Sequence, residues 1–188
     1  MQSLRLKILI FTNLICFGVF GQHYDFVKII PGQGIVFNND SIILGKTSIK
    51  EVCRIFKIKD NPNEIIVTEG TGFYEKTGES RSDTYYSREI IYKSITFTFG
   101  DENAQNYELV EIKAKEDKSL KIYTDNGLVI GMINPKLREL FPEISRRNYI
   151  SKTSLTYNLF TYGISLELEK MTNDDLKLVE ISTHRKFE

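Results

Sequence analysis

The chain has 188 residues, with 25 basic and 25 acidic side chains and a formal net charge of zero. Hydrophobic residues make up 41% of it and aromatic residues 12%, a composition that supports a buried core and excludes an intrinsically disordered protein. The balanced charge, without an extended basic run, argues against binding to nucleic acid or to an anionic membrane surface.

The first 21 residues have the pattern of a secretory signal peptide. Arg5 and Lys7 precede an apolar run from Ile8 to Phe20, and Gly21 follows it. This run is shorter than the roughly 20 residues that a membrane-spanning helix needs. We therefore expect cleavage near Gly21 and a secreted or periplasmic protein with no transmembrane segment in the mature chain. Retention of the segment as an anchor is the alternative.

The mature chain begins with short apolar segments separated by turn residues. We expect strands at Phe26–Ile30, Ile35–Phe37 and Ile42–Leu44, with the last two joined as a hairpin. Ser48, with Glu51 three residues later, has the pattern of a capping box that starts an amphipathic helix.

A segment without apolar periodicity follows this helix. Residues Glu69–Asp83 contain three glycines and mixed charges, which predict a long loop or a mobile hairpin tip. Beyond it, alternating apolar residues predict strand structure across Tyr85–Phe99 and a returning strand at Leu109–Lys115.

A degenerate copy of the pattern occurs in the second half of the chain. Gly45 and the helix after it reappear as Gly131 and a short helical segment at Leu137–Phe141, with an offset of 85 between the helices. The terminal hairpins match at an offset of 69, so that Val110 corresponds to Val179. The difference between the two offsets makes the first copy 16 residues longer, and the excess falls on residues 69–83.

These matches predict two tandem subdomains, residues 22–116 and 117–188, after the signal peptide at 1–21. Each is expected to be a β-hairpin, a helix and an antiparallel β-meander. The predicted fold class is α+β, with the helices packed on one face of antiparallel sheet.

The repeated unit resembles two classes of small α+β domain. The residues that carry the likeness are Gly45, Thr47, Glu51 and Val52 in the first copy and Gly131 in the second. The single unit resembles the outer-membrane assembly lipoprotein BamE (SmpA/OmlA) class, and the tandem arrangement resembles the β-lactamase inhibitor protein class. Both resemblances imply a protein-binding or envelope-associated role without an active site.

The residues that most catalytic and metal sites require are sparse. His23 and His184 are expected in the two terminal tails, whereas a hydrolase triad or a zinc site needs convergent side chains. Cys53 lies on the apolar face of the predicted helix, where a buried small hydrophobic residue is expected. We therefore predict no catalytic residue, no cofactor and no metal site. A small extracytoplasmic hydrolase is the alternative function.

Aromatic residues around the predicted loop are the candidates for partner binding. Phe73 and Tyr74 lie inside it, and Tyr85 and Tyr86 lie at its return. Protein interfaces are enriched in such large, rigid side chains. Packing of Tyr85 or Tyr86 on the sheet is the other interpretation. The sequence thus predicts a non-catalytic protein-binding module that contacts another protein through this loop or through a sheet face.

Overall fold

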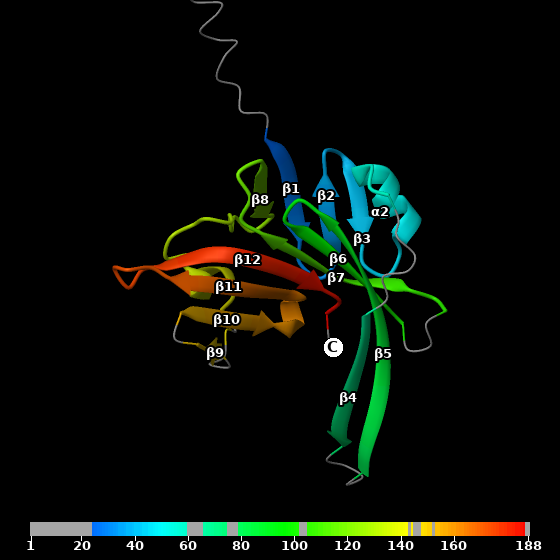
Figure 1. Cartoon of the computed structure of the whole chain (residues 1–188). Helices are drawn as coiled ribbons and strands as arrows, with labels where there is room; N and C mark the ends of the chain where they lie inside the picture. Colours follow the sequence, from blue (N-terminus) through cyan, green and yellow to red (C-terminus); the bar gives the residue numbers. More distant parts are fainter. Residues whose placement is uncertain are drawn as a thin grey trace, which may run out of the picture.

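The computed structural model describes residues 24–59, 66–74, 79–101, 105–142, 144, 148–151 and 153–186, and for 66–74, 79–85 and 148–150 it describes the backbone path. The expected signal peptide at 1–21 and His23 lie outside these residues. The described chain consists mostly of β-strands arranged in two sheets (Figure 1).

The larger sheet has eight strands in the order β4-β5-β6-β7-β12-β11-β10-β9, all paired antiparallel. From one edge to the other, these strands are β4 (Ile66–Tyr74), β5 (Glu79–Tyr92), β6 (Ile95–Asp101), β7 (Glu108–Lys115), β12 (Leu176–His184), β11 (Ile164–Lys170), β10 (Ser154–Leu159) and β9 (Asn148–Ile150).

The smaller sheet has four strands in the order β3-β2-β1-β8, of which β1 and β8 are parallel neighbours. These strands are β3 (Asp40–Ile43), β2 (Gly34–Phe37), β1 (Asp25–Ile30) and β8 (Leu120–Thr124). Both sheets thus contain strands from both halves of the chain.

The helical content is smaller than the predicted α+β class implies. Helix α2 spans Ile49–Phe56, helix α3 spans Leu137–Leu140, and a 3₁₀ turn, η1, spans Phe160–Tyr162. Helix α3 is a single turn, so the smaller sheet supplies cover that the prediction assigned to helices. The described fold is therefore mostly β.

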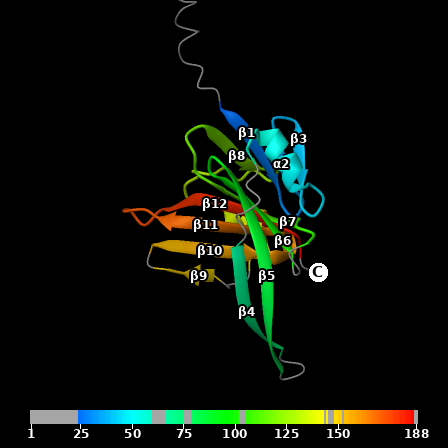
Figure 2. The ribbon, with the colours of Figure 1, turned by 45° about the vertical axis from the view of Figure 1, so that its right-hand side comes forward.

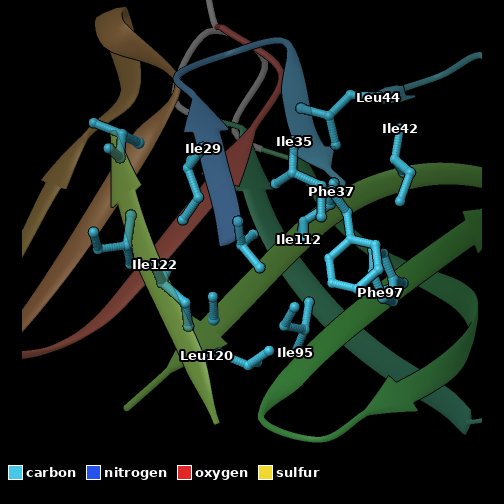
Figure 3. Close-up of a cluster of buried hydrophobic side chains, with 14 of the residues drawn as sticks. Ile29, Ile35, Phe37, Ile42, Leu44, Ile95, Phe97, Ile112, Leu120 and Ile122 are labelled. Carbon is cyan, nitrogen blue, oxygen red and sulfur yellow. The ribbon is translucent and has the colours of Figure 1, made fainter. Parts of the chain in front are cut away.

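One face of the larger sheet and one face of the smaller sheet form a shared hydrophobic core (Figure 3). Ile95, Phe97 and Phe99 alternate along β6 and are fully buried, as the alternation in the sequence predicts. From β1, Val27 and Ile29 are also fully buried. Removing each such side chain from water contributes about 1.5–3 kcal/mol to folding, so the contact between the sheets dominates the stability.

Helix α2 begins where the sequence predicts. The N–H of Glu51 donates to the Ser48 Oγ at 3.3 Å, the first bond of a capping box. On its inner face, the Phe56 ring lies 4.6 Å from Phe37 and 4.5 Å from Tyr92, centroid to centroid. Cys53 is buried beside Phe56, as predicted.

Two predicted boundaries are wrong. Strand structure does not continue across Tyr85–Phe99, because Lys93 has a φ of 52° and the chain turns there between β5 and β6. The sequence also predicts Asn134 as the N-cap of the second helix and Pro135 as its first residue, but this helix begins at Leu137. Asn134 instead accepts a hydrogen bond from the Leu176 N–H at 2.9 Å and donates to Asp175 at 2.7 Å, which ties this segment to the β11–β12 turn.

Two β-bulges interrupt the larger sheet at matching places. The register of β6 and β7 shifts between Thr98 and Phe99, and that of β11 and β12 shifts between Glu167 and Leu168. The extra residue is Val110 in β7 and Val179 in β12, which stay 69 residues apart like the rest of the hairpin.

A glycine N–H donates a hydrogen bond to a strand carbonyl beside each bulge. The Gly45 N–H donates to the Leu109 carbonyl at 2.8 Å, and the Gly131 N–H donates to the Leu178 carbonyl at 2.7 Å. Both glycines have positive φ values, 70° and 92°, which other residues adopt at a cost. A bulge leaves some backbone groups without a partner strand. Here the two glycine N–H groups donate to the carbonyl groups beside the bulges.

The two sheets are joined at a buried hydrogen-bonded junction. The Gly32 N–H lies 3.0 Å from the Gly163 carbonyl oxygen and 3.0 Å from the Thr183 Oγ1. The Thr183 hydroxyl donates to the same Gly163 carbonyl at 3.1 Å, and Thr183 is fully buried. The Gly32 turn of the smaller sheet therefore lies directly against the larger sheet.

An ion pair provides a second tie. The Lys93 ammonium, in the β5–β6 turn, donates to the Asp25 carboxylate of β1 at 2.9 Å. This hydrogen bond is the main cause that raises the pKa of Lys93 above its ordinary value.

We predict that Gly163→Ala destabilises the fold by about 2–5 kcal/mol, because it combines left-handed backbone strain with overpacking. An added Cβ would overlap the Gly32 backbone and lie 2.6 Å from the His184 carbonyl oxygen, at a φ of 68°. Gly127→Ala is the control, since Gly127 has a φ of 92° but no atom within 4 Å of an added Cβ. Urea unfolding of both variants measures the difference, and equal losses would contradict the steric role of the junction.

Candidate interaction surfaces

The most prominent surface feature is a hairpin that extends beyond the larger sheet (Figures 1 and 2). Strand β5 has 14 residues, but β6 pairs with residues 86–92 alone. Residues 79–85 pair with β4, and no other described strand lies beside them. We call residues 68–74 and 79–85 the arm. At about 3.3 Å per residue, it reaches roughly 23 Å past the sheet.

Of the two forms predicted for Glu69–Asp83, the long loop is wrong for residues 69–74 and 79–83, and their antiparallel pairing agrees with the hairpin. The physical reason is that strands pair through backbone hydrogen bonds. A strand does not need alternating apolar residues where no core covers either of its faces. The hairpin at this end of the sheet is the longer one: β4 and β5 have nine and 14 residues, whereas β9 and β10, at the other end of the sheet, have three and six.

The four aromatic candidates fall at two places on this hairpin. Phe73 and Tyr74 lie at the end of β4, opposite residues 80 and 79. Tyr85 and Tyr86 lie near the base, opposite residues 68 and 67. Five residues of strand, about 17 Å, separate the two pairs, so the structure does not bring them together into one cluster. Tyr86 is half-buried, consistent with its position at the junction with the sheet.

An arginine and a tyrosine pack together where the arm joins the sheet. The Arg88 guanidinium lies 6.0 Å from the centre of the Tyr107 ring, at the edge of the range for a cation–π contact. Ser87, the neighbour of Arg88 in β5, is 8% exposed. The base of the arm is thus packed against the sheet.

The outer face of the smaller sheet is a second candidate surface. Phe26 is 51% exposed and Ile43 is 40% exposed on it. A hollow of about 410 Å³ lies beside Phe26, Lys121 and Asp117, and another of about 390 Å³ lies beside Ile43. Hollows of this size on an open sheet face can accept side chains of a partner.

Asp117 is the acidic residue of the first hollow whose protonation is perturbed. Its Oδ1 accepts the Ser119 N–H at 2.7 Å and the Ser119 hydroxyl at 2.6 Å. The bond from the hydroxyl is the main cause that lowers the pKa of Asp117, and the bond from the N–H acts in the same direction.

The structure brings together one serine and one histidine that the sequence separates. The prediction that His184 lies in a terminal tail is wrong, because it is the last residue of β12. Its Nε2 lies 3.3 Å from the Ser165 Oγ. The His184 Nδ1 lies 3.0 Å from the Arg185 carbonyl oxygen. Because a carbonyl accepts, the His184 Nδ1 is the donor in this second contact.

This contact is the feature that the alternative hydrolase function would use. Nucleophilic catalysis also needs a cleft for the substrate and donors for the developing oxyanion. Ser165 and His184 lie on the face of the larger sheet opposite to the core and line neither of the hollows described above. Within the described residues, the contact is a hydrogen bond between the neighbouring strands β11 and β12. Among the described residues, no three His, Cys, Asp or Glu side chains form a group suited to a metal ion.

We predict that Ser119→Ala raises the pKa of Asp117 toward about 3.9, the ordinary value for aspartate. A carboxyl group whose pKa is lower in the folded protein stabilises the fold above its unfolded-state pKa and loses this effect as the pH falls through its folded-state pKa. The variant should therefore be less stable than the parent at pH 7 and equally stable in acid. Titration of the Asp117 carboxyl carbon by NMR checks the shift, and an unchanged pKa would contradict it.

Helices of membrane-crossing length and apolarity do not occur in the described part of the chain. Comparison with known proteins yields no matching family model, no matching curated protein and no matching solved structure.

Proposed function

We propose that the chain is a secreted or periplasmic, non-catalytic protein-binding module that contacts another protein through the arm. The signal-peptide pattern of residues 1–21 supports the location outside the cytoplasm. The resemblance to the BamE and β-lactamase inhibitor protein classes supports an envelope-associated or inhibitor-like role.

The arm is the observation that carries this proposal. Residues 79–85 pair with β4 and with no other described strand, whereas β6 pairs with β5 from residue 86 onward. The arm is therefore a two-stranded ribbon. An isolated ribbon of two strands is marginally stable in water, so the arm adds little to the stability of the core. Segments that a rigid scaffold holds away from its core commonly carry binding residues.

The aromatic residues of the hairpin are the proposed contacts with the partner. Phe73 and Tyr74 would contact it near the end of the arm, and Tyr85 and Tyr86 near its base. Two sites about 17 Å apart suit an extended protein surface better than a small ligand, which a single pocket encloses.

A tandem duplication is the finer architecture that we propose. The matched bulges at Val110 and Val179 support it, because an internal repeat preserves such irregularities. The amides of Gly45 and Gly131, each bound to the carbonyl before its bulge, support it further. The order of the larger sheet, which is symmetric about the β7–β12 pair, is the third support. On this proposal, the arm is an extension of the first copy.

We predict that removal of the arm abolishes partner binding and leaves the core folded. In the variant, Asn-Gly replaces residues 69–84 and joins Thr68 to Tyr85, which lie directly opposite each other, through a two-residue hairpin turn. Its thermal midpoint should change by a few degrees at most, because the removed strand residues pair with each other and with no other described strand.

Capture of a partner from the native envelope or secreted fraction should fall at least about tenfold, the effect of losing interface anchors. The control is Ile91→Ser, which changes a 60% exposed residue of β5 within the sheet and should leave capture intact. Collapse of the thermal midpoint in the arm deletion would show that the arm belongs to the core. Unchanged capture would refute the proposed function.

A further inference from the structure

Among the strands that the structure describes, none pairs with the outer edge of β4, which makes that edge a template for another strand. Residues of a strand point their N–H and C=O groups alternately to its two neighbours, so half of those in β4 point away from β5. Within the described residues, β5 is the one strand that pairs with β4. Its nine residues make β4 longer than the other outermost strands, since β3, β8 and β9 have four, five and three.

The usual protections of an edge strand are missing from β4. Natural edges carry prolines, several charges or bulges that prevent pairing with another chain. Residues 66–74 contain no proline and one charged residue, Glu69. The nine pairs between β4 and β5 run without a register shift, in contrast to the bulged pairs at the centre of the sheet.

We propose that this edge binds β4 of a second copy of the chain, antiparallel about a two-fold axis. The proposal rests on the proposed function, in which the arm makes the contact with other chains. It adds that a second copy of the chain binds along the outer edge of β4. The result is a four-stranded ribbon in the order β5-β4-β4-β5. Ribbons of three or more strands are stable where a two-stranded one is marginal, so dimerisation supplies the neighbour that the arm lacks.

The composition of the strand selects one register. All nine residues of Ile66–Tyr74 find a partner when the axis passes through Gly70, which then lies opposite itself. An axis through Glu69 pairs seven residues and sets two acidic residues opposite each other, an unfavourable arrangement. In the Gly70 register, Glu69 lies opposite Thr71 instead.

Disulfide trapping tests the register. The full chain with Cys16→Ser and Cys53→Ala provides a background without cysteines. Gly70→Cys in this background places two thiols across the axis, where Cα atoms of paired strands are about 4.5–5.5 Å apart, within the range of a disulfide. Gly72→Cys is the matched control, because it changes a glycine of the same strand two residues away from the axis.

Under mild oxidation, the Gly70→Cys variant should form a covalent dimer at least about tenfold faster than the Gly72→Cys variant. The chain without cysteine substitutions should show a monomer–dimer equilibrium by sedimentation, and the arm deletion should sediment as a monomer. Equal cross-linking of the two cysteine variants, or a chain that stays monomeric at millimolar concentration, would overturn the proposal.

The same measurements separate this inference from the proposed function. If the arm deletion loses partner capture but the parent chain is monomeric, the edge of β4 serves a strand of the other protein and the dimer is refuted. If the Gly70→Cys variant forms the covalent dimer and the arm deletion still captures the partner, the dimer stands and the proposed function fails. Sedimentation of the unmodified chain decides the case in which a cysteine variant does not fold.

Discussion

The structure depends on one constraint: the apolar face of the larger sheet must be kept from water. Ile95, Phe97 and Phe99 line part of it, and their burial requires a second layer across the sheet. The smaller sheet provides this layer, and its Gly32 turn hydrogen-bonds to Gly163 in the larger one. Gly163 has no room for a Cβ, because one would overlap the Gly32 backbone, and Gly32 itself has a positive φ of 71°.

The two parts of strand β5 have different surroundings. The core-facing residues of β5, such as Ile90, are buried against the smaller sheet and α2, while the same strand continues as the arm beyond the cover. On the proposed function, the fold would separate stability from recognition within a single strand. The central part of the sheet would hold the molecule together, and the arm would contact another chain.

Local signals in the sequence predict much of the fold. Ser48 and Glu51 mark the start of α2 because a capping box involves residues three apart, and the alternation along β6 marks its buried face. Long-range pairings have no such signature. Nothing near β1 indicates that it lies between β2 and β8, and the predicted helix layer is largely replaced by this sheet.

The sequence predicts the candidate site only in part, because the site also depends on long-range strand pairing. The sequence marks residues 69–83 as unlike the core, but strand pairing outside a core leaves no apolar alternation, so a hairpin resembles a loop there. Phe73 and Tyr85 are near in sequence, yet the hairpin separates them along its length. The contact between Ser165 and His184 depends on the register of β11 and β12 and has no motif.

Native-state hydrogen exchange of the dilute protein tests most directly whether the arm lies outside the cooperative core. Amides of β7 and β12, at the centre of the larger sheet, should exchange through global unfolding alone. Amides of residues 79–85 that bond to β4 should exchange through local opening, at a free energy at least about 2 kcal/mol lower. Equal opening free energies in the arm and in β7 would contradict this account, because the arm would then unfold with the core.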